Sequence, residues 1–286
     1  MHINLIKSFS SDGFPYQVCF SLGCHMIFAS CLNVFISNQH CDGPELPWSR
    51  VVSLPGNEVL KELETNREVG ELLRRTALPY SKYLTLSLPG SDDCVANLRL
   101  LLPPGFQESD KIGFPALLHL DGRPGGQSVT RTWRLDWETY MASKLGYVII
   151  YLDVAGSGYS GETCRKSVDG QLGLRETRDI IHVLRVVGRY PFIDERKIGV
   201  VGRGYGGYLT VRLLAQSRLA RCGVGVAPIT VWQQHNPLYT QRYLGEISIN
   251  TWEHYSQADL TRHVNTLISF SMSLLTVVLV TDCLKR

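Results

Sequence analysis

Several kinds of sequence signal are missing from this 286-residue chain. No N-x-S/T site for N-linked sugars occurs, which argues against a heavily glycosylated extracellular domain. The eight cysteines include no C-x-x-C pair, so nothing indicates a zinc ribbon. The 29 basic and 26 acidic residues form no long basic run, and the charge pattern that is typical of nucleic-acid binding is therefore absent.

Long apolar runs are scarce as well. Residues 267–280 form a run of fourteen, short of the ~20 residues that a membrane-spanning helix needs, and we expect a core strand there. Residues 13–41 carry no acid or base, but polar side chains interrupt them. Buried strands fit that stretch better, with a membrane span as the alternative. Residues 1–10 lack the basic start and apolar segment of a signal peptide.

The most informative segment has a glycine where a hydrolase carries its nucleophile. Residues 202–207 read G-R-G-Y-G-G and directly follow the apolar run at 198–201. In the nucleophile elbow G-x-S-x-G, a strand ends in a sharp turn that opens a helix and exposes a serine hydroxyl. Gly204 occupies the serine position and has no hydroxyl, so no acyl-enzyme can form there. The flanking elbow positions are Gly202, Arg203, Tyr205 and Gly206.

Two other interpretations of these glycines remain. The same residues spell G-x-G-x-x-G, a dinucleotide-binding pattern that requires an acidic residue about twenty positions further on. Residues 225–230 contain no acid, and several strand-like runs precede the glycines, whereas the pattern belongs to the first unit of a domain. A tight packing turn between a strand and a helix, with no binding role, is the second alternative.

The segments around the elbow resemble a known family in order and spacing, over roughly residues 24–264. They resemble the hydrolase domain of the dipeptidyl-peptidase branch of the prolyl oligopeptidase family. The closer resemblance is to its inactive members, the dipeptidyl-peptidase-like auxiliary subunits of A-type voltage-gated potassium channels. The segments are LETN at 63–66, LDGRPGGQ at 120–127, DW at 136–137, DVAGSGYSG at 153–161, RCGVGVAPIT at 221–230 and RYLG at 242–245.

The resemblance implies an α/β-hydrolase fold, truncated at its C-terminus and preceded by the last blade of a β-propeller. The implied division is a partial propeller at 1–55, a linker helix at 56–80 and an incomplete hydrolase domain at 81–286. The residue pattern predicts a helix over 57–77 and an antiparallel strand pair over 81–88 and 94–102. Further strands are expected at 114–120, 147–152, 197–201 and 222–227, and helices at 133–144, 172–189 and 206–216.

Carried over by position, the resemblance implies lost catalytic machinery. Asp121 matches the tyrosine that donates a hydrogen bond to the oxyanion in the family. A carboxylate at this position would repel the oxyanion by about 4 kcal/mol at a separation of about 4 Å and an effective dielectric constant of about 20. The backbone N–H of Tyr205 matches the other half of the oxyanion hole. Asp282 is a doubtful match to the acid, and no histidine follows it. The histidines at 235, 254 and 263 precede any candidate acid, so we expect them to be surface or core residues.

The resemblance also implies disulfide bonds. Cys24 and Cys41 match the pair that closes the last propeller blade, and Cys222 matches a cysteine whose family partner lies beyond the end of this chain, unless Cys283 substitutes. Disulfides belong to oxidising compartments, which implies an extracellular protein. Eight reduced, buried thiols in a cytosolic protein are the alternative.

Two further segments have a functional and a structural interpretation. Tyr239 and Tyr243 match tyrosines that shape the proline pocket of the active relatives, but packing in a core or interface is the commoner fate of such residues. Residues 156–161 are either an anion-binding loop built from backbone N–H groups or a plain turn between a strand and a helix.

The sequence therefore predicts a non-catalytic dipeptidyl-peptidase-like protein with no metal and no cofactor. By resemblance it binds a protein partner, a voltage-gated potassium channel subunit, on the extracellular side of the plasma membrane, with a homodimer in the full-length form. The family's N-terminal membrane anchor is not found in this sequence. One alternative is an active serine-type dipeptidyl peptidase that cleaves Xaa-Pro dipeptides; another is a truncated product without function.

Overall fold

The chain forms two compact units. The computed structural model describes residues 27–29, 35–40, 43, 45–53, 56, 58–90, 94–108, 112–268, 272–275 and 278–281. The smaller unit comprises Met1–Ala77 with Thr130–Asp136, and the larger unit comprises Leu78–Val129 with Trp137–Arg286. The second unit thus begins within the predicted linker at 56–80.

The smaller unit is built on an antiparallel sheet in which four strands follow one another in chain order. This four-stranded arrangement is the form of a propeller blade. A short helix, α1 (Arg67–Leu73), comes after the sheet. The strands are β1 (Ile27–Ala29), β2 (Phe35–His40), β3 (Trp48–Ser53) and β4 (Val59–Glu64).

The helix predicted over residues 57–77 is wrong for its first half. Val59–Glu64 is the edge strand β4, which pairs with β3 through Val51 opposite Lys61 and Val52 opposite Val59. The spacing of Val59, Leu60 and Leu63 suits a helix, but a free strand edge next in the chain offers backbone hydrogen bonds that override this weak preference. Only α1 is helical.

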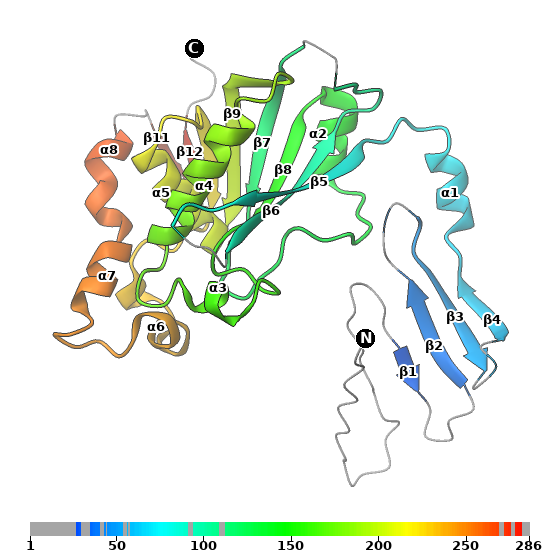
Figure 1. Cartoon of the computed structure of the whole chain (residues 1–286), viewed down its shortest axis with the longest axis horizontal. Coiled ribbons are helices and arrows are strands. Elements are labelled where there is room, and N and C mark those ends of the chain that lie inside the picture. The colour runs from blue at the N-terminus through cyan, green and yellow to red at the C-terminus, as the bar shows by residue number, and fades with distance from the viewer. Residues whose placement is uncertain are drawn as a thin grey trace, which may run out of the picture. The chain divides into compact units, whose positions relative to one another are not determined.

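The larger unit is an α/β structure around an eight-stranded mixed sheet in the order β11-β12-β10-β9-β7-β8-β6-β5 (Figure 1). β8, β7, β9 and β10 run parallel to one another, and β5–β6 and β11–β12 flank them as antiparallel pairs. The strands are β5 (Tyr80–Ser87), β6 (Val95–Leu102), β7 (Phe114–Leu120), β8 (Val148–Asp153), β9 (Ile193–Arg203), β10 (Cys222–Val226), β11 (Met272–Leu275) and β12 (Val278–Thr281).

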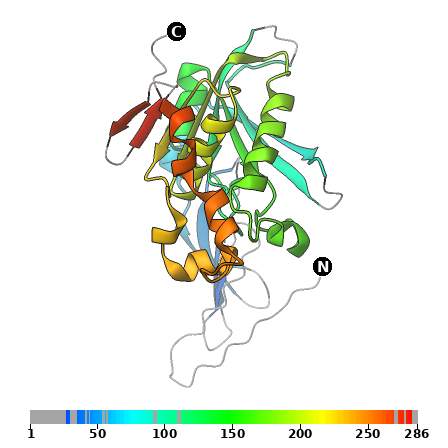
Figure 2. The same cartoon turned by 90° about the vertical axis from the view of Figure 1, so that its left-hand side faces the viewer.

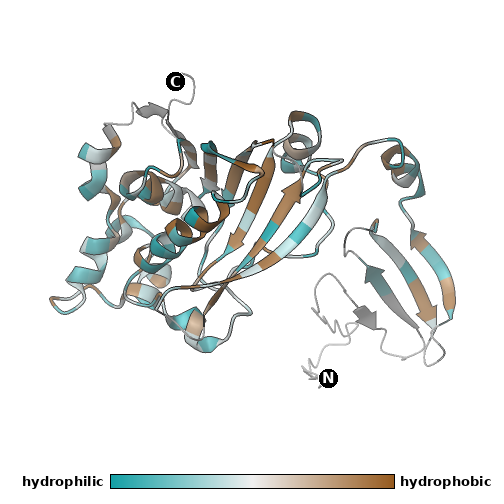
Figure 3. Cartoon of the chain, turned by 45° about the horizontal axis from the view of Figure 1, so that its top comes forward, coloured by the Kyte–Doolittle hydropathy of each residue, from teal (hydrophilic) through white to brown (hydrophobic). Residues whose placement is uncertain are grey.

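Helices cover both faces of this sheet, which explains why β7 and β8 at its centre are apolar over most of their length (Figure 3). On one face, Ala142 of α2 (Trp137–Leu145) packs with Leu101, Ile149 and Tyr151. On the other face, the alternate residues of the same strands join the core formed with α4 (Leu174–Val187) and α5 (Tyr205–Gln216).

The remaining helices are short, and most of them come from the C-terminal part of the larger unit (Figure 2). They are α3 (Glu162–Lys166), the 3-10 turn Trp232–Gln234, α6 (Pro237–Leu244), α7 (Trp252–Ala258), the 3-10 turn Leu260–His263 and α8 (Val264–Ile268).

The strands and helices predicted between residues 81 and 227 are confirmed within a few residues, and the α/β-hydrolase fold class is confirmed with them. Two predictions needed correction. The helix expected at 133–144 begins only at Trp137, because residues 130–136 belong to the smaller unit, where the Gly43 N–H donates to the Arg131 carbonyl at 2.6 Å. The single strand expected over 267–280 is instead the hairpin β11–β12.

Most of residues 13–41, for which a membrane span is the alternative, lie outside the described residues. Within the described part of the chain, no helix has the length and apolar character to cross a bilayer.

We expect the sheet core to set the stability of the larger unit. Leu118 in β7 is 0% exposed, whereas Leu238 at the start of α6 is 85% exposed. Leu118→Ala should lower the free energy of unfolding by about 3 kcal/mol, through lost burial and the cavity left behind, and Leu238→Ala by less than about 0.5 kcal/mol. Urea denaturation measures both, and equal losses would contradict this placement of the core.

Candidate active site

The elbow predicted from the sequence is present in the larger unit. β9 ends at Arg203, Gly204 has φ 57° and ψ −113°, and α5 begins at Tyr205. This is the strand–turn–helix context of a nucleophile elbow. The Gly204 N–H donates to the Val226 carbonyl at 2.9 Å, and no atom lies within 4 Å of where a Cβ on residue 204 would stand. The backbone thus leaves room for a side chain that the sequence does not supply.

The first turn of α5 lies directly against the end of β7. A Cβ on Gly206 would collide with the Leu120 carbonyl oxygen and would stand 3.1 Å from the Asp121 Cα. Because residue 121 is the first after β7, this contact places it beside the elbow. The structure therefore brings together Gly204, Tyr205 and Asp121, as the sequence predicted, although their roles in an oxyanion hole stay a prediction.

Asp121 is not an isolated carboxylate. Arg123 binds both of its oxygens, Nε to Oδ1 at 2.8 Å and the terminal nitrogen to Oδ2 at 3.1 Å. The hydrogen bond to Asp121 and its charge raise the pKa of Arg123. The repulsion that the sequence predicts between Asp121 and an oxyanion would therefore be weaker, because the guanidinium of Arg123 offsets part of the carboxylate charge.

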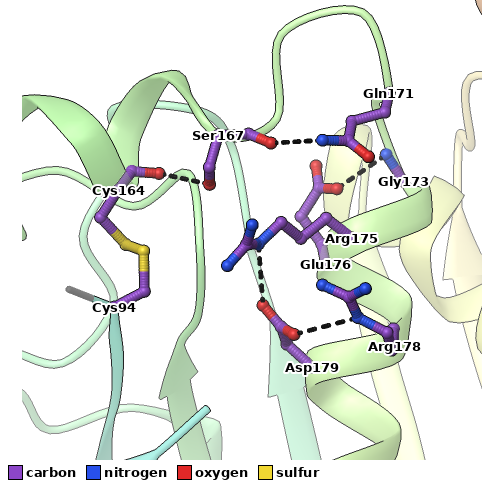
Figure 4. Close-up of polar contacts among 9 residues, drawn as sticks. All are labelled: Cys94, Cys164, Ser167, Gln171, Gly173, Arg175, Glu176, Arg178 and Asp179. Carbon is purple, nitrogen blue, oxygen red and sulfur yellow. Dashed lines mark hydrogen bonds and ion pairs between the residues drawn. A yellow bond between two sulfur atoms is a disulfide. The ribbon is translucent and has the colours of Figure 1, made fainter. Parts of the chain in front are cut away.

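The side chain of Tyr205 points into the protein rather than toward the elbow opening. Its hydroxyl donates to Oε1 of Glu176, a fully buried residue of α4. The second oxygen of Glu176 accepts the Gly173 N–H at 2.9 Å, which satisfies the start of α4 (Figure 4). Burial raises the pKa of Glu176 to about 7, against the opposing effects of Tyr205, Gly173 and the Arg212 guanidinium.

A second buried carboxylate lies one turn further along α4. Asp179 is 0% exposed and forms ion pairs with Arg175 at 3.8 Å and with Arg178 at 3.7 Å (Figure 4). Burial raises the pKa of Asp179, and the charges of Arg175 and Arg178 oppose this shift. The helix predicted at 172–189 is therefore correct, but its buried face carries acids as well as the expected Ile180 and Leu184.

Tyr239 and Tyr243 belong to a group of aromatic rings that packs next to the elbow. The ring of Trp232, which is fully buried, lies 5.8 Å from Tyr205 and 6.1 Å from Tyr239, and Tyr239 lies 5.1 Å from Tyr243. Tyr243 is 8% exposed. Tyr239 is half-buried, and burial raises its pKa. These rings pack as a core layer that borders the elbow, while their role in a substrate pocket stays a prediction.

The loop at 156–161 has the hydrogen bonds of a turn. The Gly156 N–H donates to the Cys164 carbonyl at 3.1 Å, the Ser157 N–H to the Val154 carbonyl at 3.1 Å, and the Gly158 N–H to the Gly126 carbonyl at 2.8 Å. Because these three N–H groups are already engaged, they are not free to bind an anion, and the plain-turn interpretation holds for them.

The loop after β7 is held by a buried acid that the sequence did not single out. Asp153, at the end of β8, is 4% exposed and accepts the N–H groups of Ser128 at 2.8 Å and Val129 at 2.9 Å. Burial raises the pKa of Asp153, and the two N–H donors oppose this effect.

Three of the described cysteines are disulfide-bonded. Cys94, just before β6, is bonded to Cys164 in α3, with their Cα atoms 5.3 Å apart. This pair could not be predicted from the sequence, because the two cysteines are 70 residues apart and match no motif. Cys222 is also disulfide-bonded. Cys24, Cys41 and Cys283, named in the predicted pairings, lie outside the described residues.

The remaining catalytic candidates do not assemble a triad with the elbow among the described residues. His254 Nδ1 lies 3.1 Å from the Leu244 carbonyl, and His235 packs edge-on against Trp232 and Tyr239. Burial lowers the pKa of His263. Asp282 lies outside the described residues. In the part of the chain that the structure describes, no group of three histidine, cysteine or acidic residues has the placement of a metal site.

Comparison with known proteins matches this geometry to one family. The model of the prolyl oligopeptidase family matches residues 133–281, a little over half of the chain. The chain is 33% identical over 247 residues to the "Probable dipeptidyl-aminopeptidase B" of Coccidioides posadasii (strain C735), covering 85% of this chain and 26% of that protein. The Paracoccidioides lutzii protein of the same name is 33% identical over 238 residues, covering 82% of this chain and 24% of that protein.

A solved structure shows the same fold. The crystal structure of Porphyromonas gingivalis dipeptidyl peptidase 4 superposes with a TM-score of 0.77 at 25% identity, over 85% of this chain and 34% of that one. The chain spans about a quarter of the length of the curated relatives that it matches. The dinucleotide-binding interpretation of the glycines is thereby replaced by that of a hydrolase elbow.

The buried Glu176 predicts a pH-dependent stability. Its pKa is 4.5 when unperturbed and about 7 in the folded chain, so the folded state holds an extra proton between these values. The free energy of unfolding should therefore fall as the pH rises from 4 to 8, by about 3 kcal/mol from this group. Denaturation at pH 4 and pH 8 measures the change.

Two variants separate Glu176 from other titrating groups. Glu176→Gln cannot titrate, so the stability lost between pH 4 and pH 8 should shrink by about 3 kcal/mol relative to the natural chain. Glu246→Gln, at an exposed position, should leave that loss unchanged. An equal loss in all three proteins would show that another group is responsible.

Proposed function

The chain belongs to the prolyl oligopeptidase family, and on that premise we propose that it is a dipeptidyl-peptidase-like member that cleaves no peptides and acts by binding a protein partner. Its relatives carry names of dipeptidyl aminopeptidases and peptidases. We therefore infer that the chain shares the fold of these relatives but not the activity in their names.

Gly204 is the observation that carries the proposal. Acyl transfer on this fold needs an oxygen nucleophile at the tip of the elbow, and residue 204 has none. The turn itself is intact and the space for a side chain is open. Loss of the nucleophile costs on the order of 10⁶ in rate in a serine hydrolase, which leaves no useful turnover.

The Asp121–Arg123 pair gives independent support. Asp121 stands where the resemblance places an oxyanion donor, and a carboxylate accepts hydrogen bonds but donates none when ionised. Arg123 offsets the charge of Asp121 but does not replace the missing oxyanion donor, because both of its hydrogen bonds go to the Asp121 carboxylate. Removal of one oxyanion donor costs about 10²–10³ in rate. Two chemically separate positions thus favour a protein without catalysis.

The partner and the location follow from the resemblance stated above. We propose that the partner is a pore-forming subunit of a voltage-gated potassium channel and that the protein acts at the plasma membrane, on its extracellular side. The Cys94–Cys164 disulfide suits an oxidising compartment.

A covalent probe tests the absence of catalysis. The purified chain should show no labelling of residue 204 by a fluorophosphonate and no release of chromophore from a Gly-Pro chromogenic dipeptide, because no hydroxyl is present to attack either compound. Mass spectrometry of the labelled peptides and absorbance report the two outcomes. An adduct at residue 204 or specific turnover would overturn the proposal.

Gly204→Ser provides the matched control. Its hydroxyl enters the open space above the turn, so it reports whether a nucleophile at that position alone restores reactivity. We expect labelling at about a hundredth to a thousandth of the rate of an active serine peptidase, because the oxyanion side of the site still carries Asp121. Full labelling of this variant would show that Gly204 is the single lesion.

Co-precipitation tests the binding role. The tagged chain, expressed with an A-type potassium channel subunit, should recover that subunit from detergent extracts, and an unrelated membrane protein should not be recovered. Recovery of neither protein would contradict the proposed partner while leaving the probe result unaffected.

A further inference from the structure

Two loops at one edge of the parallel strands hold each other through backbone hydrogen bonds. The loop after β7 carries Asp121 and Arg123, and the loop after β8 continues into α3. The Gly125 N–H donates to the Gly156 carbonyl at 2.8 Å, and the Gly158 N–H donates to the Gly126 carbonyl at 2.8 Å. A movement of the second loop therefore moves the first.

The second loop is in turn attached to Cys164. The Gly156 N–H donates to the Cys164 carbonyl at 3.1 Å, and the Ser167 hydroxyl donates to the same oxygen at 2.7 Å (Figure 4). Through its sulfur, Cys164 is bonded to Cys94 at the start of β6. The disulfide thus joins this loop pair to a strand in the core of the sheet.

α3 has little else to hold it against the core. It has five residues, far fewer than an isolated helix needs for stability, and Cys164 is its only buried residue. The ion pairs of Glu162 with Arg165 and Lys166 are exposed at the surface, where such pairs contribute little. The disulfide is therefore the main attachment of α3 to the core. The next buried residue along the chain is Val168.

Other contacts fix the far ends of the two loops independently of the disulfide. Asp153 accepts the N–H groups of Ser128 and Val129, and the first turn of α5 packs against Leu120. Loss of the disulfide should therefore loosen residues 123–126 and 156–166 while Asp121, β9, α5 and the elbow turn stay in place.

We propose that the Cys94–Cys164 disulfide is a redox-sensitive clamp on the two loops that border the elbow, and that its reduction frees α3 and moves Arg123 away from Asp121, whose backbone α5 holds in place. A dithiol supplies the two electrons and two protons: one thiolate attacks a sulfur, the second thiol resolves the mixed disulfide, and two cysteine thiols and an oxidised dithiol result. This inference does not depend on the proposed function.

Hydrogen–deuterium exchange on the full chain tests the clamp. After reduction by dithiothreitol, the amides of Gly125, Gly156 and Gly158 should exchange about tenfold faster or more, because their acceptor carbonyls move away, while amides of β9 and α5 keep their protection. Alkylation with iodoacetamide and mass spectrometry establish that both thiols are free.

Dithiothreitol also reduces the disulfide of Cys222, so two variants are needed to assign the loop response to the Cys94–Cys164 bond. Cys222→Ser should show the same loop response to reduction as the natural chain. Cys94→Ser/Cys164→Ser should exchange fast in both loops without reductant and show no further change with it. If this double variant fails to fold, reduction of the natural chain and of Cys222→Ser carries the test.

Two results would overturn the inference. One is unchanged protection of the three glycine amides after both thiols have been alkylated. The other is an equal rise in exchange across β9 and α5, which would identify the bond as a staple of the whole fold rather than a clamp on the loops.

Discussion

The close approach of α5 to the end of β7 is the constraint on which the rest of the site depends. Only glycine fits at position 206, because the Leu120 carbonyl occupies the space of any Cβ. This contact fixes the first turn of the helix, which in turn fixes the conformation of Gly204 and the position of Asp121. The backbone of a hydrolase site is therefore determined by packing, independently of whether a nucleophile is present.

Behind this turn, the protein holds several charged groups away from water. Glu176 and Asp179 of α4 and Arg212 of α5 are all buried. Glu176 reaches the elbow through the Tyr205 hydroxyl, and Arg212 reaches the Gln257 carbonyl at 2.9 Å. Buried polar networks of this kind hold one arrangement of helices in preference to others when their members are bonded. The side facing water carries the Asp121–Arg123 pair.

Much of this arrangement was predictable from the sequence where local pattern and fold agree. The apolar runs at 114–120, 147–152 and 197–201 are buried strands, and the glycines at 202–207 specify the turn. Prediction failed for β4 because the spacing of Val59, Leu60 and Leu63 suits a helix, although β4 pairs with the strand just before it in the chain. It also failed where partners come from distant segments, as for the Cys94–Cys164 bond and the burial of Glu176 against Tyr205. An acid within an amphipathic helix is usually exposed, so the sequence offered no reason to place Glu176 in the core.

Gly204 also affects the energy of the folded backbone. A residue with a side chain at φ 57° and ψ −113° is strained by about 1–3 kcal/mol, a cost that hydrolases bear to present their nucleophile. Glycine adopts the same angles without steric conflict. Glycine at position 204 thus gives a more relaxed turn than serine would, and a change to serine would carry this cost in folded-state stability.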